Sequence, residues 1–413
     1  MSQINAVETT NYAYDNANRI SGITNTTNSA LSWTYGYDLL DRLTSAGVSG
    51  TSFGWTYDAN GNRLTQTGTD EWTLNVRSTN NQITSTTGTQ ARTYTYDAAG
   101  NSLTYQTNTF TYSDSDRLKT LKVGSSTTTY VINALGQRVK KSGGSAGTVL
   151  YMYDETGHTL GEYTSTGALT EETIWLGDIP VATIVPSGST VAVYYLMTDH
   201  LNTPKKIGQP SSNKLAWRWD NDPFGIFTPN QNPQSLGTFV YNLRLPGQMY
   251  DSEAGLNYNY ARDFDPQVGR YVEPDPIGLD GGINVYSYAV ANPISFSDRS
   301  GLIDPYKHLP RPIQPPSNGN VFPGFNTQDG VCTLPGRIGR AANGNLCILG
   351  CCKAHDDCYT KNGCNMSSWL GNAVGWPFPN KQCQKCNSNV VDCVIDNAGR
   401  DGSAPCKSCQ ASK

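Results

Sequence analysis

The chain has 413 residues, of which 37% are hydrophobic, and a formal net charge of −4. This length is ample for two or three domains, and no apolar run approaches the roughly 20 residues that a membrane-spanning helix needs. The first ten residues lack a basic end followed by an apolar core, so we expect no ordinary secretory signal peptide. Export then uses other machinery, or the chain is the C-terminal piece of a longer protein. No motif is typical of nucleic-acid binding, so we expect no such partner.

A short unit recurs from Tyr12 to about Leu160. It consists of an aromatic residue, Thr or Gly, Tyr and Asp, then small residues, Gly or Asn, Arg and an aliphatic residue. Alternation and the richness in Thr and Tyr predict two short strands and a tight turn for each copy. Stacked side by side, the hairpins form one long antiparallel sheet that must twist to bury a face, and the tyrosines stack on it. The copies begin at Tyr12, Tyr35, Trp55, Tyr94, Phe110 and Tyr151, with weaker ones at Trp72 and Tyr130.

These copies resemble the YD repeats of Rhs proteins and of related toxin-complex subunits. In those families the sheet spirals into a hollow shell around a C-terminal toxin, so the resemblance implies a mainly β shell over residues 1–272. It also implies a polymorphic toxin delivered to a target cell by specialised export. With only about eight repeats, a further shell or secretion-system partner at the N-terminal side is expected. Supporting segments are Thr198–Pro204, Leu243–Gln248, Gly255–Asn259 and Asp265–Tyr271.

Residues 273–302 resemble the closing segment of Rhs repeat regions, where the chain is cut after the second Asp-Pro-x-Gly-Leu motif by paired aspartates. The resemblance implies that Asp275 and Asp298 perform self-cleavage after Leu302. Two neighbouring carboxylates cannot easily both ionise, so one acts as an acid while the other activates water. In this chain Arg299 stands where the family pattern has proline. The alternative is that both aspartates only form turns.

Residues 303–330 are rich in proline and poor in apolar residues, which is typical of a linker. All 11 cysteines follow it, between Cys332 and Cys409, which indicates a small disulfide-bonded domain at 331–413 made for an oxidising compartment. The pair Cys406 and Cys409 could instead serve zinc or redox chemistry. From Ile303 onward the net charge is +4, against −8 before it, which suits either an anionic lipid surface or ordinary surface lysines.

Cys351 and Cys358 fall two turns apart on one face of a predicted helix, with His355 between them. Cys386 and Cys393 repeat this spacing. Four cysteines allow three pairings. Our hypothesis is Cys351 with Cys393 and Cys358 with Cys386, because this pairing gives matched rungs between antiparallel helices.

The run Cys351–Tyr359 resembles the active-site helix of secretory phospholipase A2 enzymes, and Cys386–Cys393 resembles its partner helix. This resemblance implies a small α-helical domain that hydrolyses the sn-2 ester of membrane phospholipids with calcium. His355 is then the general base, Asp356 the calcium ligand, and Tyr359 supports the residue that orients the histidine. That residue is Asn387, where the family has aspartate.

In that family a bond equivalent to Cys332–Cys352 places the calcium-binding loop, whose remaining calcium ligands are backbone carbonyls. A producer whose own membrane is a substrate needs an immunity protein, which we expect as a further partner. Two alternatives stay open: a structural disulfide-bonded domain whose histidine is incidental, and a delivery scaffold whose terminal domain has lost catalysis.

Overall fold

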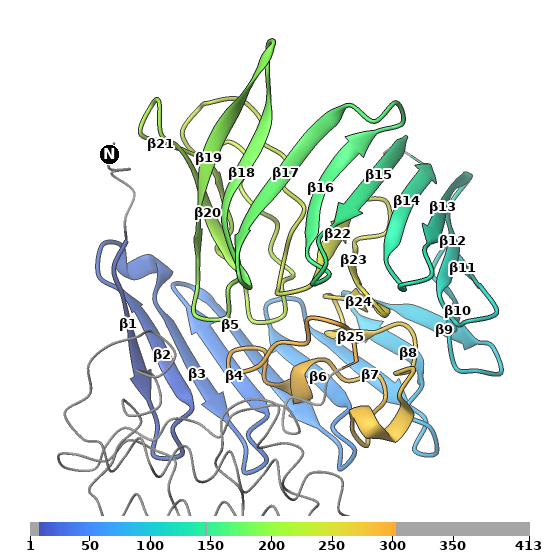
Figure 1. The fold of residues 1–413 in the computed structure, drawn as a ribbon. Coiled ribbons are helices and arrows are strands. Elements are labelled where there is room, and N and C mark those ends of the chain that lie inside the picture. The colour runs from blue at the N-terminus through green and yellow to red at the C-terminus, as the bar shows by residue number, and fades with distance from the viewer. Residues whose placement is uncertain (1–7, 145–146, 303–413) are drawn as a thin grey trace, which may run out of the picture. The chain divides into compact units, whose positions relative to one another are not determined.

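The computed structural model describes residues 8–144 and 147–302, which belong to a compact unit spanning Met1–Pro310. In these residues the secondary structure is almost entirely β, and no helix is long and apolar enough to cross a membrane. The predicted mainly β architecture is therefore confirmed for this part of the chain (Figure 1).

Twenty-one consecutive strands form one antiparallel sheet, which we call the wall. Each strand pairs with the strand before it and the strand after it in the chain, from β1 to β21. The strands are β1 (Thr10–Tyr14), β2 (Ile20–Asn25), β3 (Trp33–Tyr37), β4 (Leu43–Val48), β5 (Thr51–Tyr57), β6 (Arg63–Gly68), β7 (Trp72–Val76), β8 (Ile83–Gly88), β9 (Arg92–Tyr96), β10 (Ser102–Tyr105), β11 (Asn108–Tyr112), β12 (Leu118–Val123), β13 (Ser126–Ile132), β14 (Arg138–Gly143), β15 (Thr148–Tyr153), β16 (Thr159–Thr164), β17 (Leu169–Leu176), β18 (Ile179–Ser187), β19 (Thr190–Thr198), β20 (Pro204–Gln209) and β21 (Lys214–Arg218).

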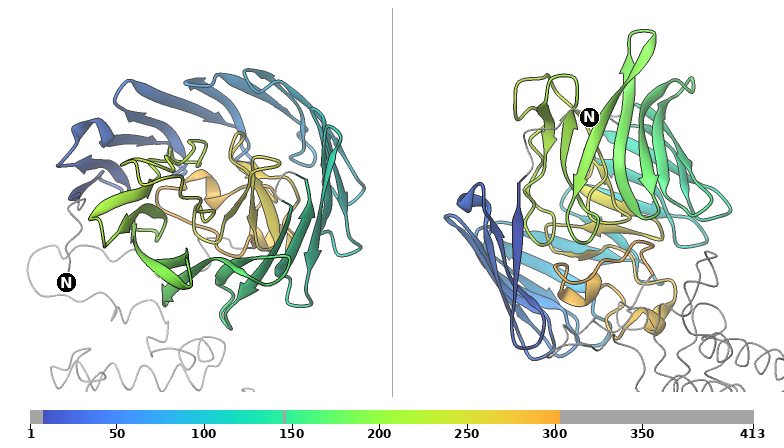
Figure 2. Two further views of the ribbon diagram at one scale, coloured as in Figure 1. Left: turned by 90° about the horizontal axis from the view of Figure 1, so that it is seen from above. Right: turned by 60° about the vertical axis from the view of Figure 1, so that its left-hand side comes forward.

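The chain then forms a second, four-stranded sheet and short 3-10 turns. We call residues 219–302, which include this sheet, its turns and its loops, the inner segment. It lies inside the curve of the wall (Figure 2). Its sheet is again an antiparallel meander. The remaining elements are β22 (Met249–Asp251), β23 (Leu256–Asn259), β24 (Arg262–Asp265), β25 (Arg270–Tyr271), η1 (Ser29–Leu31), η2 (Gly278–Gly281) and η3 (Ala289–Ala291).

The wall curves because its hairpins carry a β-bulge at a repeated position. The pairing register shifts just before the second tyrosine of the repeat, as between Gly36 and Tyr37 or between Thr56 and Tyr57. The same shift recurs in β11 and β15. A bulge bends its strand and increases the local twist, so repeated bulges bend the sheet in one direction.

The aspartate of each repeat shapes the turn between paired strands. Asp38 Oδ1 accepts the amides of Leu40 and Arg42 at 2.9 and 3.0 Å, while Asp41 adopts the left-handed conformation at φ 61°. Aspartate, asparagine and glycine tolerate that conformation best, which explains the small residues that follow each Tyr-Asp pair.

Arginine and tyrosine connect each hairpin to its neighbours. Arg42 donates to the backbone carbonyl of Asp58 in the next repeat at 2.7 Å. Tyr57 donates in the opposite direction, to the carbonyl of Leu43 at 2.6 Å. The Arg42 guanidinium also lies over the Tyr57 ring, 4.8 Å from its centroid. An isolated hairpin is marginal in water, so these links make the repeats stable as a set and confirm the structural role predicted for the tyrosines.

Buried side chains of the wall pack against the inner segment in two hydrophobic clusters. One joins Trp55 and Leu43 of the wall to Trp219 and Phe264, and the other joins wall residues such as Phe110 to Leu256. The inner segment is therefore the second layer of the core.

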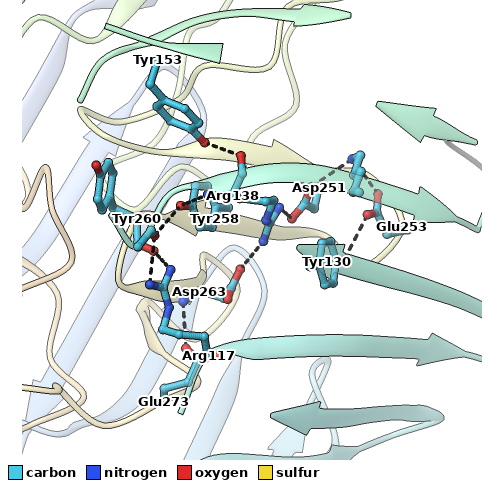
Figure 3. A network of polar contacts seen from close by, with 12 residues as sticks. Arg117, Tyr130, Arg138, Tyr153, Asp251, Glu253, Tyr258, Tyr260, Asp263 and Glu273 are labelled. Carbon is cyan, nitrogen blue, oxygen red and sulfur yellow. Dashed lines mark hydrogen bonds and ion pairs between the residues drawn. The ribbon is translucent and has the colours of Figure 1, made fainter. Parts of the chain in front are cut away.

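Buried ion pairs also fasten the wall to the inner segment (Figure 3). Arg138 of β14 pairs with Asp251 of β22 and lies 2.9 Å from Asp263 of β24. Lys141, on the same strand, lies 3.0 Å from Asp251. Burial alone would raise the pKa of Asp251, but these two cations outweigh it and lower the pKa. For Asp263 the effect of burial is larger than that of Arg138, and it raises the pKa of this carboxyl to about 6.

Removing the Asp251 charge should unfold the protein much more readily. Asp251→Asn leaves Arg138 and Lys141 buried with too little negative charge, and breaking a buried pair in this way costs about 3–5 kcal/mol. The matched control is Asp220→Asn, which removes an exposed partner of Arg218 and should cost at most about 1 kcal/mol. Urea unfolding at pH 7 compares the two. Equal midpoints for both variants would show that the buried pair contributes nothing special.

Strand β17 carries a buried glutamate, Glu171. Glu171 accepts hydrogen bonds from Thr173 at 3.0 Å and Thr183 at 2.7 Å. Burial, with the nearby charge of Glu162, raises its pKa to about 8. Between the unfolded pKa near 4.5 and this folded value, the folded protein holds a proton that the unfolded chain has released. Stability must therefore fall as the pH rises through that window.

Glu171→Gln should flatten this pH dependence, because glutamine can accept the same hydroxyl hydrogen bonds without titrating. The free energy of unfolding, measured from pH 5 to pH 9, should decline less in the variant, with a difference of at least ~1 kcal/mol at the alkaline end. Parallel curves would contradict a buried, protonated Glu171.

Candidate functional site

The two aspartates predicted for self-cleavage lie on the same guanidinium group. Asp275 Oδ2 is 3.0 Å and Asp298 Oδ2 is 3.1 Å from Arg262 Nη2, and all three side chains are almost fully buried. Arg262 belongs to β24, whereas the aspartates lie on the loops that follow β25. The fold therefore brings together two carboxylates that are separated by more than twenty residues in the chain.

The residue predicted to precede the cut lies directly against this pair. The Leu302 amide donates to Asp298 Oδ1 at 3.1 Å. Arg262 Nε donates to the carbonyl of Gly301 at 2.5 Å. Gly301 itself has φ 69°, and a Cβ there would lie 2.4 Å from the Asn259 carbonyl, so a side chain could enter this turn only by moving the backbone.

Further polar groups fix the Asp298 side chain. The Tyr271 hydroxyl donates to Asp298 Oδ2 at 2.9 Å, and Asn259 Nδ2 donates both to the Tyr271 hydroxyl and to the Asp298 carbonyl. A Cβ at Gly281 would lie 2.2 Å from Asp275 Oδ2. Both carboxylates are thus closely surrounded by the inner segment.

The electrostatics raise the pKa of one member of this pair, Asp275. Burial raises the pKa of Asp275, the negative charge of Asp298 raises it further, and the guanidinium of Arg262 opposes both. A carboxylic acid that keeps its proton beside an ionised one is the arrangement by which aspartates divide acid and base roles.

Sequence patterns singled out the aspartates but not the groups that organise them. Arg262 and Tyr271 were not assigned a role, because an arginine and a tyrosine in polar β segments have no distinctive spacing. Only the pairing of β23, β24 and β25 brings them to Asp298.

The predicted lipid-hydrolysing site lies outside the described residues. In residues 8–144 and 147–302, no group of three or more His, Cys, Asp or Glu side chains could hold a metal ion. The calcium ligand and its neighbours remain predictions from the sequence. Outside the described residues lie His355, Asn387, Tyr359, Asp356 and the cysteines Cys332, Cys351, Cys352, Cys358, Cys386 and Cys393.

Comparison with known proteins identifies the shell. Residues 3–294 match the Teneurin YD-shell family. Because this match covers more than half of the chain, the chain belongs to that family, and the prediction of a YD-repeat shell is confirmed.

Several relatives are bacterial toxins. The chain is 28% identical over 267 residues to double-stranded DNA deaminase toxin A of Burkholderia cenocepacia, covering 57% of this chain and 18% of that protein. It is 36% identical over 124 residues to the toxin protein Tse5 of Pseudomonas aeruginosa, covering 30% and 9%. The chain thus spans less than a fifth of either relative.

Solved structures share the fold. The crystal structure of TcdB2-TccC3-TEV superposes with a TM-score of 0.56 at 18% identity, covering 72% of this chain and 17% of that one. A Tc holotoxin pore structure from Photorhabdus luminescens gives the same values.

Proposed function

We propose that the chain is the shell of a bacterial Rhs-type toxin, and that it cuts itself after Leu302 to free its C-terminal segment. The observation that carries this proposal is the buried pair of Asp275 and Asp298 on Arg262, with Asp298 bound to the Leu302 amide. Two observations support the delivery role: the chain belongs to the YD-shell family, and several of its relatives are toxins.

The chemistry divides between the two carboxyls. Asp298 takes a proton from water as its oxygen attacks the Leu302 carbonyl carbon, and Asp275 gives its proton to the carbonyl oxygen. When the intermediate collapses, the bond to Ile303 breaks, the departing amine takes the proton held by Asp298, and one hydroxyl of the intermediate returns its proton to Asp275 as the carbonyl forms again. Arg262 keeps the ionised carboxylate stable in a buried site.

Self-cleavage is read from a denaturing gel of the full chain. The wild type should yield two pieces, and N-terminal sequencing of the smaller should begin at Ile303. Asp298→Asn and Asp275→Asn should each leave a single intact band, since each removes one half of the acid-base pair. Asp280→Asn, an exposed carboxyl in the same segment, is the matched control and should cleave normally. An intact wild-type band would refute the proposal.

The rate should also depend on pH in a defined direction. Because Asp275 must be protonated and its pKa is raised by burial, cleavage should slow as the pH rises above that pKa. A rate that increases steadily with pH would exclude Asp275 as the acid.

The open sheet supports a partner for the shell. Within residues 8–144 and 147–302, β1 pairs only with β2, and β21 pairs only with β20 apart from one bridge between Arg218 and Asn230. Unpaired strand edges are ready to accept further strands. We propose that further shell or a secretion-system component completes the wall during export to a target cell.

For the released domain, residues 331–413, we propose calcium-dependent hydrolysis of phospholipid sn-2 esters, with His355 as the base and Asp356 on calcium. The support is the sequence motif Cys351–Tyr359 and its partner Cys386–Cys393. The names of relatives point to other chemistry, a DNA deaminase and probable deoxyribonucleases. An immunity protein in the producing cell follows from this lipid substrate.

Fatty-acid release from mixed phospholipid vesicles tests the lipase. Activity of the full chain should require calcium and fall at least ~100-fold in His355→Gln, because general-base catalysis contributes that much. Asp356→Asn should act through calcium affinity, whereas Asp357→Asn, its neighbour in sequence, should change little. Activity that survives a calcium chelator would remove this mechanism, and no activity at all would favour a non-catalytic scaffold.

A further inference from the structure

The side chain of Arg299 joins the end of the inner segment to two turns of the wall. Its Nη1 pairs with Asp178, in the turn between β17 and β18, and its Nη2 lies 2.7 Å from Nε2 of His158, just before β16. We call Arg299, Asp178, His158 and Asp154 the Arg299 cluster. Arg299 directly follows Asp298, so the cluster adjoins one of the two carboxyls proposed to make the cut.

The histidine of this cluster is fixed in place. Its ring stacks on Trp175, with centroids 4.5 Å apart, and its Nδ1 lies 2.8 Å from Asp154 Oδ2. Burial alone would raise the pKa of Asp154, but hydrogen bonds from His158 and Thr156 lower it to about 2. An ionised Asp154 can only accept, so Nδ1 donates to it, while Nε2 faces both Arg299 Nη2 and Asp178 Oδ1, the latter at 3.0 Å.

The backbone of Arg299 is held as well. Gly247, at φ 84°, packs so closely that a Cβ there would lie 2.1 Å from the Arg299 carbonyl oxygen. The next carbonyl, that of Ser300, accepts the amide of Ala261 at 3.1 Å. The inner segment therefore holds the backbone of this residue, and the wall holds its side chain. A cavity of about 340 Å³ lies between them, lined by His158, Asp178 and Arg299 among others.

We propose that Arg299 is a positioning residue. Through its attachment to Asp178 and His158, self-cleavage depends on strands β16 to β18 of the wall being in place beside the inner segment. This inference rests on the proposed self-cleavage. If β16–β18 are displaced, Arg299 loses both partners, and the segment that carries Asp298 and the Leu302 amide is held by the inner segment alone. The cut is then made faster in a chain whose wall is in place.

Cell-free synthesis of the full chain, followed on gels over time, tests this role. Asp178→Asn and Arg299→Gln should each slow cleavage about five- to tenfold, the range expected when an accessible ion pair that aligns a catalytic group is lost. The double variant should be no slower than Arg299→Gln alone, because that change already removes the contact with Asp178. Asp178→Glu should restore most of the rate. The matched control is Asp220→Asn, which removes an exposed acid paired with Arg218 elsewhere and should cleave at the wild-type rate.

An unchanged rate in Asp178→Asn, or additive effects in the double variant, would overturn the proposal. Hydrogen exchange of the amides of residues 298–302 gives a second reading, made on the full chain carrying Asp275→Asn so that no cleavage interferes. Adding Asp178→Asn should speed exchange there if the attachment holds the segment, and unchanged exchange would refute it. A wild-type chain that never cleaves would instead refute the proposed function, and the exchange measurement would still decide whether Arg299 positions the segment.

Discussion

Buried guanidinium groups that bridge two carboxylates are the interaction on which this structure depends. Arg138 joins Asp251 and Asp263, and Arg262 joins Asp275 and Asp298. The first connects the wall to the inner segment. The second connects strands and loops within that segment. Taking such charges out of water is costly unless every partner is present, so each bridge is stable only when the whole surrounding fold is formed. The bridges therefore favour one arrangement over partly assembled ones.

The same physical constraint gives the candidate site its chemistry. Two carboxylates near one guanidinium carry a charge imbalance, which is relieved when one of them keeps a proton. The raised pKa of Asp275 reflects its burial and the neighbouring charge of Asp298. The residues that fix Asp298, namely Tyr271 and Asn259, lie on strands of the inner sheet. Burial against one guanidinium distinguishes this pair from the aspartates of the repeats, although Asp275 also accepts the Ile277 amide, and Asp298 the Leu302 amide, as turn-forming aspartates do.

The sequence allowed the repeat, its hairpins and the role of its tyrosines to be predicted, because the period and the Tyr-Asp pair are local signals. It also pointed to Asp275 and Asp298 through a family resemblance. It did not reveal Arg262 at the centre of the pair, nor Arg299 reaching Asp178, since these contacts join residues far apart in the chain. Strands β17 to β19 lie beyond the clear repeats and were not assigned individually. The bulges recur just before the second tyrosine of the repeat, but the repeat pattern predicted only hairpins and not this irregular pairing.

Those bulges have a consequence for how such proteins diverge. Each hairpin with its bulge adds to the bend of the wall. The number of hairpins between β1 and β17 therefore determines the position of the Asp178 turn relative to residue 299. Gain or loss of one repeat would carry that turn away by a whole hairpin's width, about 10 Å for two strands. Repeat number and the closing segment must then evolve together.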